Sequence, residues 1–272
     1  MLSTLLEQFD RAVLAIVTAP ANRWPMLDQL LAAIDRSTLL AGGLFVAVLC
    51  WLWAEALQRG RDAERRVVRM VIGLIAALAV GRAAQLLAPH RPRPLAEPAL
   101  GIAWPPNPDA DELYDWSSMP SDHAIYFIAL AAAFYFRSRW LGIAMGLWSL
   151  LFGLLPRIYF GQHYPSDVVV GIAIGVLVAI AAMKLPLPER LLDLPGRLAL
   201  RFPAPFYALA MLVALEMATM FFETRAWLHR AGLAFHALRE TPAQIAAPAA
   251  PPPGAPVLPA RLEAARPVPP PP

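Results

Sequence analysis

The 272-residue chain contains one cysteine, Cys50, and one lysine, Lys184. A single cysteine excludes an intrachain disulfide framework, and it excludes zinc or iron–sulfur centres built from several thiolates. Charged residues are also scarce, at 16% of the chain against about 25% in a typical soluble domain. The net charge of +3 is too weak and too scattered for a nucleic-acid binder. Hydrophobic residues, in contrast, reach 58%, which predicts a membrane protein.

Long apolar runs carry most of this hydrophobic content. A helix needs about 20 mostly apolar residues to cross a ~30 Å hydrocarbon core. Six runs bounded by charges or prolines approach this length, which predicts an all-α, polytopic membrane protein with a six-transmembrane-helix bundle. The predicted spans are 38–57, 67–88, 123–136, 140–155, 167–185 and 203–222. The third and fourth are separated only by Arg137-Ser138-Arg139, which predicts a tight hairpin.

The distribution of cations predicts the orientation of these spans. Arginines, together with Lys184, gather in the segments 59–69, 137–139 and 184–201, and positive loops stay in the cytoplasm. The segment 109–115 on the opposite side is acidic. With six spans, both termini are expected to face outward.

The segments outside the spans differ in character. Apolar residues recur at helical spacing in 1–37, which predicts two interfacial amphipathic helices, and the lack of a basic start argues against a cleaved signal peptide. The six-span domain covers 38–222. A third interfacial helix is expected at 223–240. The segment 241–272 holds twelve of the 29 prolines, which predicts a disordered Pro/Ala-rich tail.

Polar residues on the outward side gather in three clusters, of which the middle one is 120–123. Proline favours the first helical position, so Pro120 is expected to open the third span. The backbone N–H groups of Ser121, Asp122 and His123 then lie at a positively polarised helix end that can bind a phosphate. The plainer interpretation is an ordinary capped helix start with a solvated histidine.

The last cluster runs from Arg157 to Asp167. His163 and Asp167 are four residues apart around Pro165, so the carboxylate can reach one imidazole nitrogen and leave the other basic. Such a histidine can attack phosphorus while Arg157 binds phosphoryl oxygens with its forked cation. The alternative is a surface ion pair at a helix start. The first cluster offers Arg91 and Arg93 between prolines, which could equally be interfacial anchors.

Together the three clusters resemble the signature of the type 2 phosphatidic acid phosphatase superfamily. Its members share Lys-x6-Arg-Pro, Pro-Ser-Gly-His and Arg-x5-His-x3-Asp elements in this order. The third element is complete here as Arg157, His163 and Asp167, whereas Asp122 replaces the glycine and Pro156 stands where serine is common. The Pro-Ser-Asp-His variant is similar to the bacterial undecaprenyl-diphosphatase branch. The resemblance spans 86–167, and the six-span layout extends it to nearly all of the chain before the tail.

The first element departs from the family pattern. Counting back from Arg93 places Leu86 where the family has its lysine. Arg82 lies one helical turn deeper on the same helix face. We expect Arg82 to extend its guanidinium toward the phosphate site and partly replace the lysine. The equally open alternative is that Arg82 pairs with an unrelated group or faces the edge of the bilayer.

The resemblance implies a metal-free, cofactor-free phosphoryl transfer through a phosphohistidine. His163 is then the nucleophile aligned by Asp167, and His123 is the acid and base. The phosphate-binding groups are expected in a small cationic cup outside the cytoplasm: Arg93, Arg157, Ser121, Asp122, Arg91 and Arg82. For Asp122, contacts with Arg91 or with a substrate hydroxyl are both open.

The implied substrate is a lipid phosphate in the bilayer of a bacterial inner membrane, with no nucleic acid involved and protein partners unknown. Undecaprenyl diphosphate is favoured, which links the chain to cell-wall precursors. Phosphatidate, phosphatidylglycerol phosphate and lipid A are alternatives. A weak lipid-binding or lipid-translocating protein is a further one, because of the missing lysine. A vanadate-dependent haloperoxidase uses a related site, but those enzymes are soluble.

Overall fold

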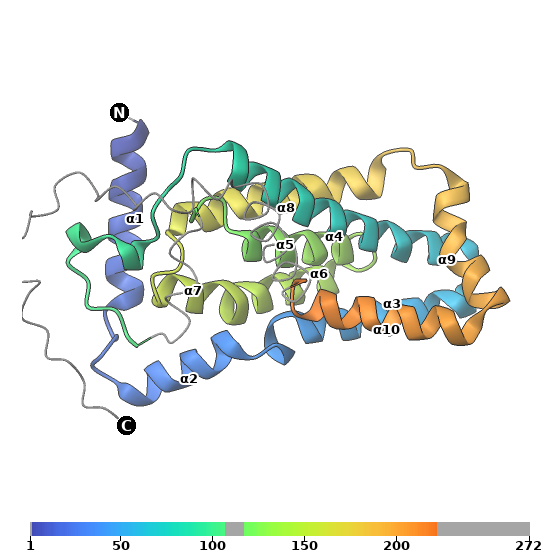
Figure 1. Ribbon diagram of the computed structural model, residues 1–272, viewed down its shortest axis with the longest axis horizontal. Coiled ribbons are helices and arrows are strands. Elements are labelled where there is room, and N and C mark those ends of the chain that lie inside the picture. The colour runs from blue at the N-terminus through green and yellow to red at the C-terminus, as the bar shows by residue number, and fades with distance from the viewer. Residues whose placement is uncertain (1, 107–116, 222–272) are drawn as a thin grey trace, which may run out of the picture. The chain divides into compact units, whose positions relative to one another are not determined.

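The computed structural model describes residues 2–106 and 117–221, and they form helices without any strand (Figure 1). The expected all-α class is confirmed. The predicted acidic loop, third interfacial helix and proline-rich tail lie outside the described residues. The helices are α1 (Leu2–Thr18), α2 (Pro25–Arg36), α3 (Leu44–Arg59), α4 (Arg61–Leu87), α5 (Asp122–Tyr135), α6 (Arg139–Trp148), α7 (Leu155–Tyr159), α8 (Pro165–Lys184), α9 (Glu189–Arg201) and α10 (Pro203–Ala218).

Short π and 3-10 segments complete these helices. The π turn η1 (Leu39–Gly43) leads into α3, and the π turn η5 (Ser149–Leu154) joins α6 to α7. Pro156, at the start of α7, cannot donate a backbone hydrogen bond, and a π turn directly before a proline accommodates this gap in the helix. The 3-10 turns η2 (Pro94–Ala96) and η3 (Pro98–Leu100) follow α4.

An apolar helix occurs at each of the six predicted spans. Four continuous helical stretches in the described residues are long and apolar enough to cross a membrane: Leu39–Arg59, Arg61–Leu87, Arg139–Tyr159 and Pro165–Lys184. The helices α5 and α10 are apolar but shorter. The chain is therefore a membrane protein, and the count of six spans stays a prediction.

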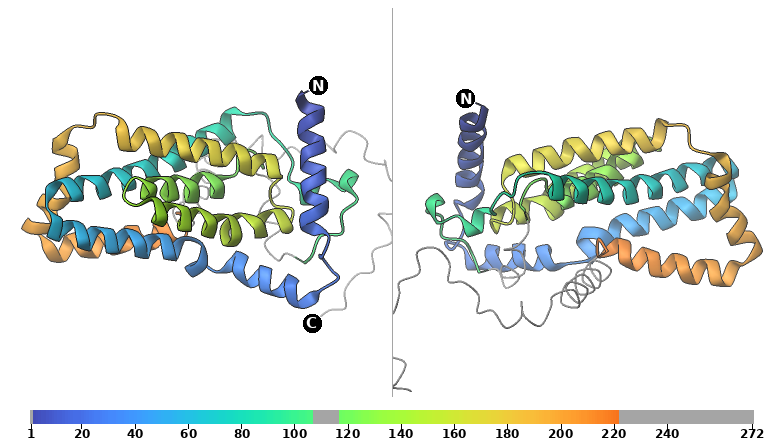
Figure 2. Two further views of the ribbon diagram at one scale, coloured as in Figure 1. Left: turned by 180° about the vertical axis from the view of Figure 1, so that it is seen from behind. Right: turned by 45° about the horizontal axis from the view of Figure 1, so that its top comes forward.

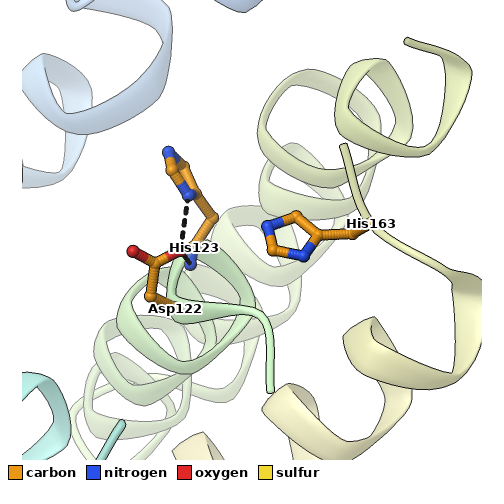
Figure 3. Close-up of side chains that lie close together, drawn as sticks. All are labelled: Asp122, His123 and His163. Carbon is orange, nitrogen blue, oxygen red and sulfur yellow. Dashed lines mark hydrogen bonds and ion pairs between the residues drawn. The ribbon is translucent and has the colours of Figure 1, made fainter. Parts of the chain in front are cut away.

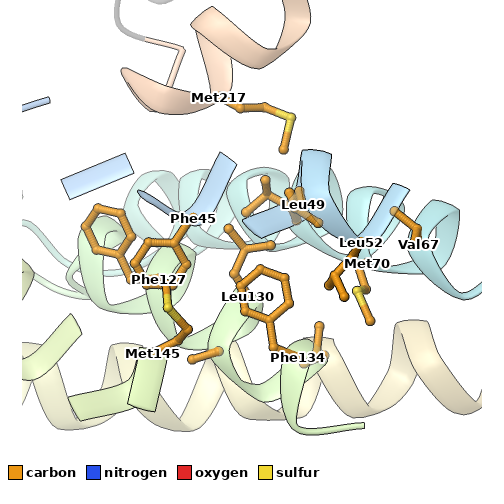
Figure 4. Close-up of a cluster of buried hydrophobic side chains, with 14 of the residues drawn as sticks. Phe45, Leu49, Leu52, Val67, Met70, Phe127, Leu130, Phe134, Met145 and Met217 are labelled. Atoms are coloured by element: carbon orange, nitrogen blue, oxygen red, sulfur yellow. The ribbon is translucent and has the colours of Figure 1, made fainter. Parts of the chain in front are cut away.

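The core lies where α3, α4, α5 and α6 meet (Figure 4). Phe45 and Phe127 pack with their ring centroids 5.2 Å apart, and Leu130 and Phe134 extend this contact along α5. The helix α5 is buried on nearly every side, which explains why it can be short and still hold its place at the centre.

Glycines allow α8 to approach α5 closely. A Cβ atom on Gly171 would lie 2.7 Å from the carbonyl oxygen of Ser121, and one on Gly175 would lie 2.7 Å from that of Ile125. Small residues at such crossings let helix backbones pack directly in a membrane. This contact positions the start of α8 beside the start of α5.

The arginine-rich segments meet at one end of the bundle. Arg137, in the hairpin between α5 and α6, contacts Glu55 of α3 at 3.0 Å, and Arg65 of α4 contacts Asp193 of α9 at 2.6 Å. The hairpin is as predicted. The helix α9, in contrast, was expected to be loop. Its internal proline, Pro195, and its arginines are typical of a loop, so the sequence pattern did not predict this amphipathic helix. Arg65 of α4 pairs with acidic residues on the polar face of α9.

The two predicted N-terminal helices are present as α1 and α2. Figures 1 and 2 show α1 lying across the end of the bundle opposite α9, whereas α2 runs back along the bundle toward α3. Leu14 of α1 is fully buried, and α1 contacts both α7 and α8. The interfacial position of these helices stays a prediction.

Candidate functional site

Three segments distant in sequence converge at the end of the bundle covered by α1. They are the loop after α4, the approach to α5 and the start of α8. Backbone hydrogen bonds join them: the Ser118 N–H donates to the Arg91 carbonyl at 2.9 Å, that of Ser121 to Asp167 at 3.2 Å, and that of Leu95 to Gly161 at 2.9 Å. The three clusters singled out from the sequence therefore form one site.

His163 is buried between α7 and α8, with 2% of its surface exposed. Its Nδ1 lies 2.9 Å from the backbone carbonyl oxygen of Ser118. A carbonyl accepts but cannot donate, so Nδ1 carries the proton and Nε2 keeps its lone pair. Burial, aided by the positive charge of Arg93, lowers the pKa of His163 well below its usual value. The structure thus holds a neutral imidazole in one tautomer.

The partner of His163 differs from the predicted one. Asp167 was expected to fix the tautomer, but its carboxylate lies 4.0 Å from Nδ1, beyond hydrogen-bond range. The carboxylate instead accepts the Tyr164 backbone N–H at 2.8 Å and a hydrogen bond from Arg91 at 2.5 Å. The spacing along the helix correctly indicated that Asp167 lies near His163. The oxygen that contacts Nδ1, however, belongs to Ser118, in a loop remote in sequence.

His123 faces His163 from the first turn of α5, with ring centroids 6.5 Å apart (Figure 3). Its Nδ1 lies 2.9 Å from Oδ1 of Asp122, and the same oxygen accepts the backbone N–H of His123 at 2.9 Å. Asp122 therefore orients the His123 ring and leaves Nε2 for other contacts. The contact of Asp122 with a substrate hydroxyl stays a prediction.

Ser121 is the N-cap of α5, and its hydroxyl accepts the Ala124 N–H at 3.4 Å. The helix begins at Asp122, so the prediction that Pro120 is its first residue was wrong. A serine at the N-cap accepts a hydrogen bond from a backbone N–H of the first helical turn, which would otherwise stay unpaired. This capping explains why α5 starts after Ser121 and not at Pro120. Ser121 is fully buried.

Arg93 is the buried arginine of the site, with 7% of its surface exposed. It donates to the Gln162 carbonyl at 2.7 Å, next to His163. Burial lowers the pKa of Arg93, and the charge of Asp122 acts against this shift. The positive charge of Arg93 acts on His163, and phosphate binding by Arg93 stays a prediction.

Arg157 lies in α7 and is held by two groups. Its Nε contacts Oδ1 of Asp35 at 2.9 Å, and one terminal nitrogen donates to the Gln162 side chain at 2.5 Å. The Gln162 amide in turn donates to Oδ2 of Asp35 at 2.9 Å. Asp35 belongs to α2, and its side chain is 6% exposed.

Arg91 has a different environment from the predicted one. Its guanidinium contacts Asp10 at 2.7 Å and Asp167 at 2.5 Å, and it stacks on the Tyr164 ring at 3.9 Å. Burial alone would lower the pKa of Arg91, but the two carboxylates raise it. Its guanidinium thus binds two carboxylates and the Ser166 hydroxyl, and phosphate binding by Arg91 stays a prediction.

Arg82 reaches the site through one intermediate. It donates to the Gln85 side chain at 3.0 Å, and Gln85 donates to the Pro120 carbonyl at 3.0 Å, next to Ser121. Leu86, at the position of the family lysine, is 74% exposed. The link through Gln85 brings Arg82 to the site's border, and its contact with substrate stays a prediction.

The site carries less positive charge than the sequence predicted. The arginines 91, 93 and 157 share this end of the bundle with the carboxylates of Asp10, Asp35, Asp122 and Asp167. Two of these carboxylates come from α1 and α2, where no motif marked them. Asp10 and Asp35, together with Ser118 and Gln162, are the functional candidates that sequence reasoning missed.

One trio in the described part of the chain could hold a metal ion. Potential ligand atoms of Asp122, His123 and His163 all lie within 4.8 Å of one another (Figure 3). The Nδ1 atoms of both rings and Oδ1 of Asp122 already have hydrogen-bonding partners within the protein. The donor set suits zinc in type, although Zn–N bonds of about 2.0–2.1 Å require the groups to move together.

The chain was compared with protein families and with known proteins. Residues 66–190 match the family model of the PAP2 superfamily. The chain is 28% identical over 153 residues to undecaprenyl-diphosphatase BcrC of Bacillus subtilis (strain 168), covering 56% of this chain and 72% of the relative. It is 26% identical over 179 residues to putative undecaprenyl-diphosphatase YbjG of Escherichia coli (strain K12), covering 65% and 83%.

A third relative is matched over a shorter region. The chain is 38% identical over 80 residues to lipid A 4'-phosphatase of Bacteroides thetaiotaomicron, covering 26% of this chain and 35% of the relative. No solved structure shows significant similarity to the chain.

Proposed function

Residues 66–190 form a PAP2 superfamily domain, and from this premise we propose that the chain is a membrane lipid phosphatase that hydrolyses undecaprenyl diphosphate to undecaprenyl phosphate and phosphate. The single observation that carries the proposal is the His163 imidazole. It is buried, which lowers its pKa, and the Ser118 carbonyl at 2.9 Å selects the tautomer with Nε2 unprotonated. A histidine in this state is a nucleophile ready for phosphorus.

In the first step, Nε2 of His163 attacks the terminal phosphorus. A P–N bond forms while the bond from phosphorus to the bridging oxygen breaks. The Nδ1 proton stays on its nitrogen, hydrogen-bonded to Ser118, and the Asp167 carboxylate at 4.0 Å counters the positive charge that develops on the ring. Asp167 thus acts on the nucleophile by charge.

His123 handles the protons. Its Nε2 gives a proton to the departing lipid phosphate oxygen, and the carboxylate of Asp122 keeps the ring oriented during this transfer. In the second step, neutral His123 takes a proton from water as the water oxygen attacks phosphorus. The P–N bond then breaks, which releases phosphate and returns His163 to its neutral form.

Charge on the transferring phosphoryl group is balanced by the protein. Arg93 and Arg157 supply guanidinium groups that can bind phosphoryl oxygens in a forked geometry. Ser121 can donate its hydroxyl hydrogen, because the bond with Ala124 uses only the oxygen. These groups carry the chemistry without a metal ion or cofactor in our proposal.

The substrate proposal rests on the names of two relatives and on the site's location. Both undecaprenyl-diphosphatase relatives cover more than half of this chain. The site lies at one end of apolar helices, so we expect it at the level of the lipid headgroups while the hydrocarbon tail stays in the bilayer. Lipid A, phosphatidate and phosphatidylglycerol phosphate satisfy the same geometry, so they belong in the test.

We further propose that the site faces the periplasm across the inner membrane. The arginine-rich ends of α3, α4 and α9 lie at the opposite end of the bundle, and such ends stay in the cytoplasm. In a Cys50→Ser background, a membrane-impermeant maleimide should label His90→Cys in intact spheroplasts and Glu189→Cys only after lysis. The reverse pattern would overturn this orientation.

Phosphate release by the purified full chain tests the function. The panel contains undecaprenyl diphosphate, phosphatidate, phosphatidylglycerol phosphate and lipid A, each assayed with and without chelator. We expect fastest release from undecaprenyl diphosphate and no effect of the chelator. His163→Asn should lower the rate at least about a thousandfold. The matched control is His90→Asn, an exposed histidine near this end, which should keep wild-type activity.

The other outcomes separate the alternatives. Faster release from another lipid would identify that lipid as the preferred substrate and would leave the proposed mechanism unchanged. Absence of release from every lipid would reject the phosphatase mechanism and favour lipid binding or translocation. Loss of activity with chelator would assign the trio around His163 to a metal ion.

A further inference from the structure

The helices α1 and α2 precede the PAP2 superfamily domain in sequence, but each sends one buried carboxylate into the site. Asp10 of α1 is 2% exposed and Asp35 of α2 has a side chain that is 6% exposed. Each of these carboxylates binds one site arginine, Arg91 and Arg157 respectively. The family-model match begins at residue 66, so neither carboxylate lies within it.

The contacts of Asp35 fix the orientation of Arg157. Oδ1 accepts from Nε of the guanidinium at 2.9 Å, while Oδ2 accepts from the Gln162 amide at 2.9 Å. The Gln162 oxygen accepts from a terminal nitrogen of the same arginine at 2.5 Å. This closed ring of three side chains holds the plane of the guanidinium and leaves its other terminal nitrogen outside the ring.

Asp10 performs the corresponding task at the start of α8. Its Oδ1 accepts the Ser166 backbone N–H at 2.8 Å, and its Oδ2 contacts both the Ser166 hydroxyl and Arg91 at 2.7 Å. Arg91 then reaches Asp167, whose carboxylate lies 4.0 Å from Nδ1 of His163. Asp10 therefore secures the first turn of α8, which directly follows the loop carrying the nucleophile.

We propose that Asp10 and Asp35 are positioning residues of the phosphatase, so that α1 and α2 are part of its working site. This inference rests on the proposed function. A buried carboxylate near an anion-binding site is electrostatically unfavourable for phosphate, since like charges repel. Its presence is explained when it orients an arginine whose misplacement by about 1 Å would cost catalysis about a hundredfold.

Electrostatics and positioning make opposite predictions for Asp35→Asn. Removing a negative charge by itself should strengthen binding of the anionic substrate, which lowers KM and leaves kcat unchanged. Loss of positioning should lower kcat, by about 10- to 100-fold, without a fall in KM that compensates for it. Asp35→Glu keeps the charge and both oxygens, and we expect it to restore kcat to within about fivefold of wild type.

Asp28 provides a matched control on the same helix. Its carboxylate accepts a hydrogen bond from the Tyr159 hydroxyl, so it also docks α2 on α7, but it contacts no site arginine in the described structure. If Asp35 acted only by docking α2, Asp28→Asn would reduce kcat as much as Asp35→Asn. We expect Asp28→Asn to keep kcat within about twofold of wild type. On α1, the exposed Glu7→Gln is the control for Asp10→Asn.

Double-mutant cycles on the full chain complete the test, with undecaprenyl diphosphate as the probe. Once Arg157→Gln has removed the group that Asp35 orients, Asp35→Asn should change kcat less than about twofold. For Asp10→Asn in an Arg91→Gln background, we expect a smaller loss of kcat than in wild type, although the contacts of Asp10 with Ser166 still contribute. Additive losses in either cycle would overturn the inference for that carboxylate while the phosphatase function stands. A wild-type protein without activity on any lipid would overturn the proposed function and this inference with it.

Discussion

The Nδ1 atom of His163 lies 2.9 Å from the carbonyl oxygen of Ser118, although 45 residues separate them in the chain. A backbone carbonyl cannot titrate, so this contact selects the same tautomer at every pH at which the ring is neutral. A carboxylate in this place would favour the charged imidazole more strongly than the carbonyl does, and burial of the ring lowers its pKa and favours the neutral form. The loop before α5 thus orients the proposed nucleophile.

The pH dependence of activity should reflect this state of His163. Burial and Arg93 lower the pKa of His163, so the ring stays neutral as the pH falls through 6.5, its ordinary value. We expect the acid limb of kcat/KM to lie below pH 6.5. Arg93→Gln removes a positive charge, which raises the pKa of His163 and should move the acid limb to higher pH. A limb that stays in place in the variant would show that another group sets it.

Substitution of Gly171 should separate the starts of α5 and α8. A Cβ there would lie 2.7 Å from the Ser121 carbonyl oxygen, so Gly171→Ala should destabilise the protein by about 1–3 kcal/mol and lower activity. Thermal unfolding in detergent measures the first effect. Gly146→Ala is the control, because no atom lies within 4 Å of the added Cβ and alanine favours a helix by up to ~1 kcal/mol. Equal stability of the two variants would contradict the close contact.

Ser121 should have a role beyond helix capping. Ser121→Ala removes the N-cap of α5 and should cost about 0.5–2 kcal/mol of stability. Ser138 caps α6 in the same way at the opposite end of the bundle, accepting the Leu141 N–H at 3.5 Å, so Ser138→Ala is a matched control. If the Ser121 hydroxyl donates to the phosphoryl group, only Ser121→Ala should also lower kcat, by about a hundredfold. Similar kcat values for both variants would restrict Ser121 to capping.

Arg82 offers a test of the missing family lysine. If its guanidinium reaches the phosphate, Arg82→Ala should raise KM or lower kcat by about tenfold, equivalent to about 1.4 kcal/mol of lost charge-assisted bonding. Arg69→Ala removes a guanidinium from the same helix, where it binds the Ala182 and Leu185 carbonyls, and should leave both constants near wild type. Wild-type kinetics in Arg82→Ala would reject the hypothesis that Arg82 replaces the family lysine.

Local sequence patterns predicted the elements well where a single segment contains the whole signal. The apolar run at 167–185 predicted α8, and Arg137-Ser138-Arg139 predicted the hairpin before α6. They failed for α9, because alternating charges and an internal proline resemble a loop until Asp193 and Glu189 are paired with Arg65. When a helix is stabilised by charges on a neighbouring helix, its own residues do not show a pattern strong enough to predict it.

The sequence by itself determined that the chain is a helical membrane protein and which motif residues meet at one end, because apolar length and the order of the three motifs are properties of the chain. Only the tertiary structure decided which atoms touch. It assigned the Ser118 carbonyl to His163, turned Arg91 toward Asp10 and Asp167, and brought Asp35 to Arg157. Hydrogen bonds depend on fractions of an ångström between segments, and helix packing sets those distances, which residue spacing does not encode.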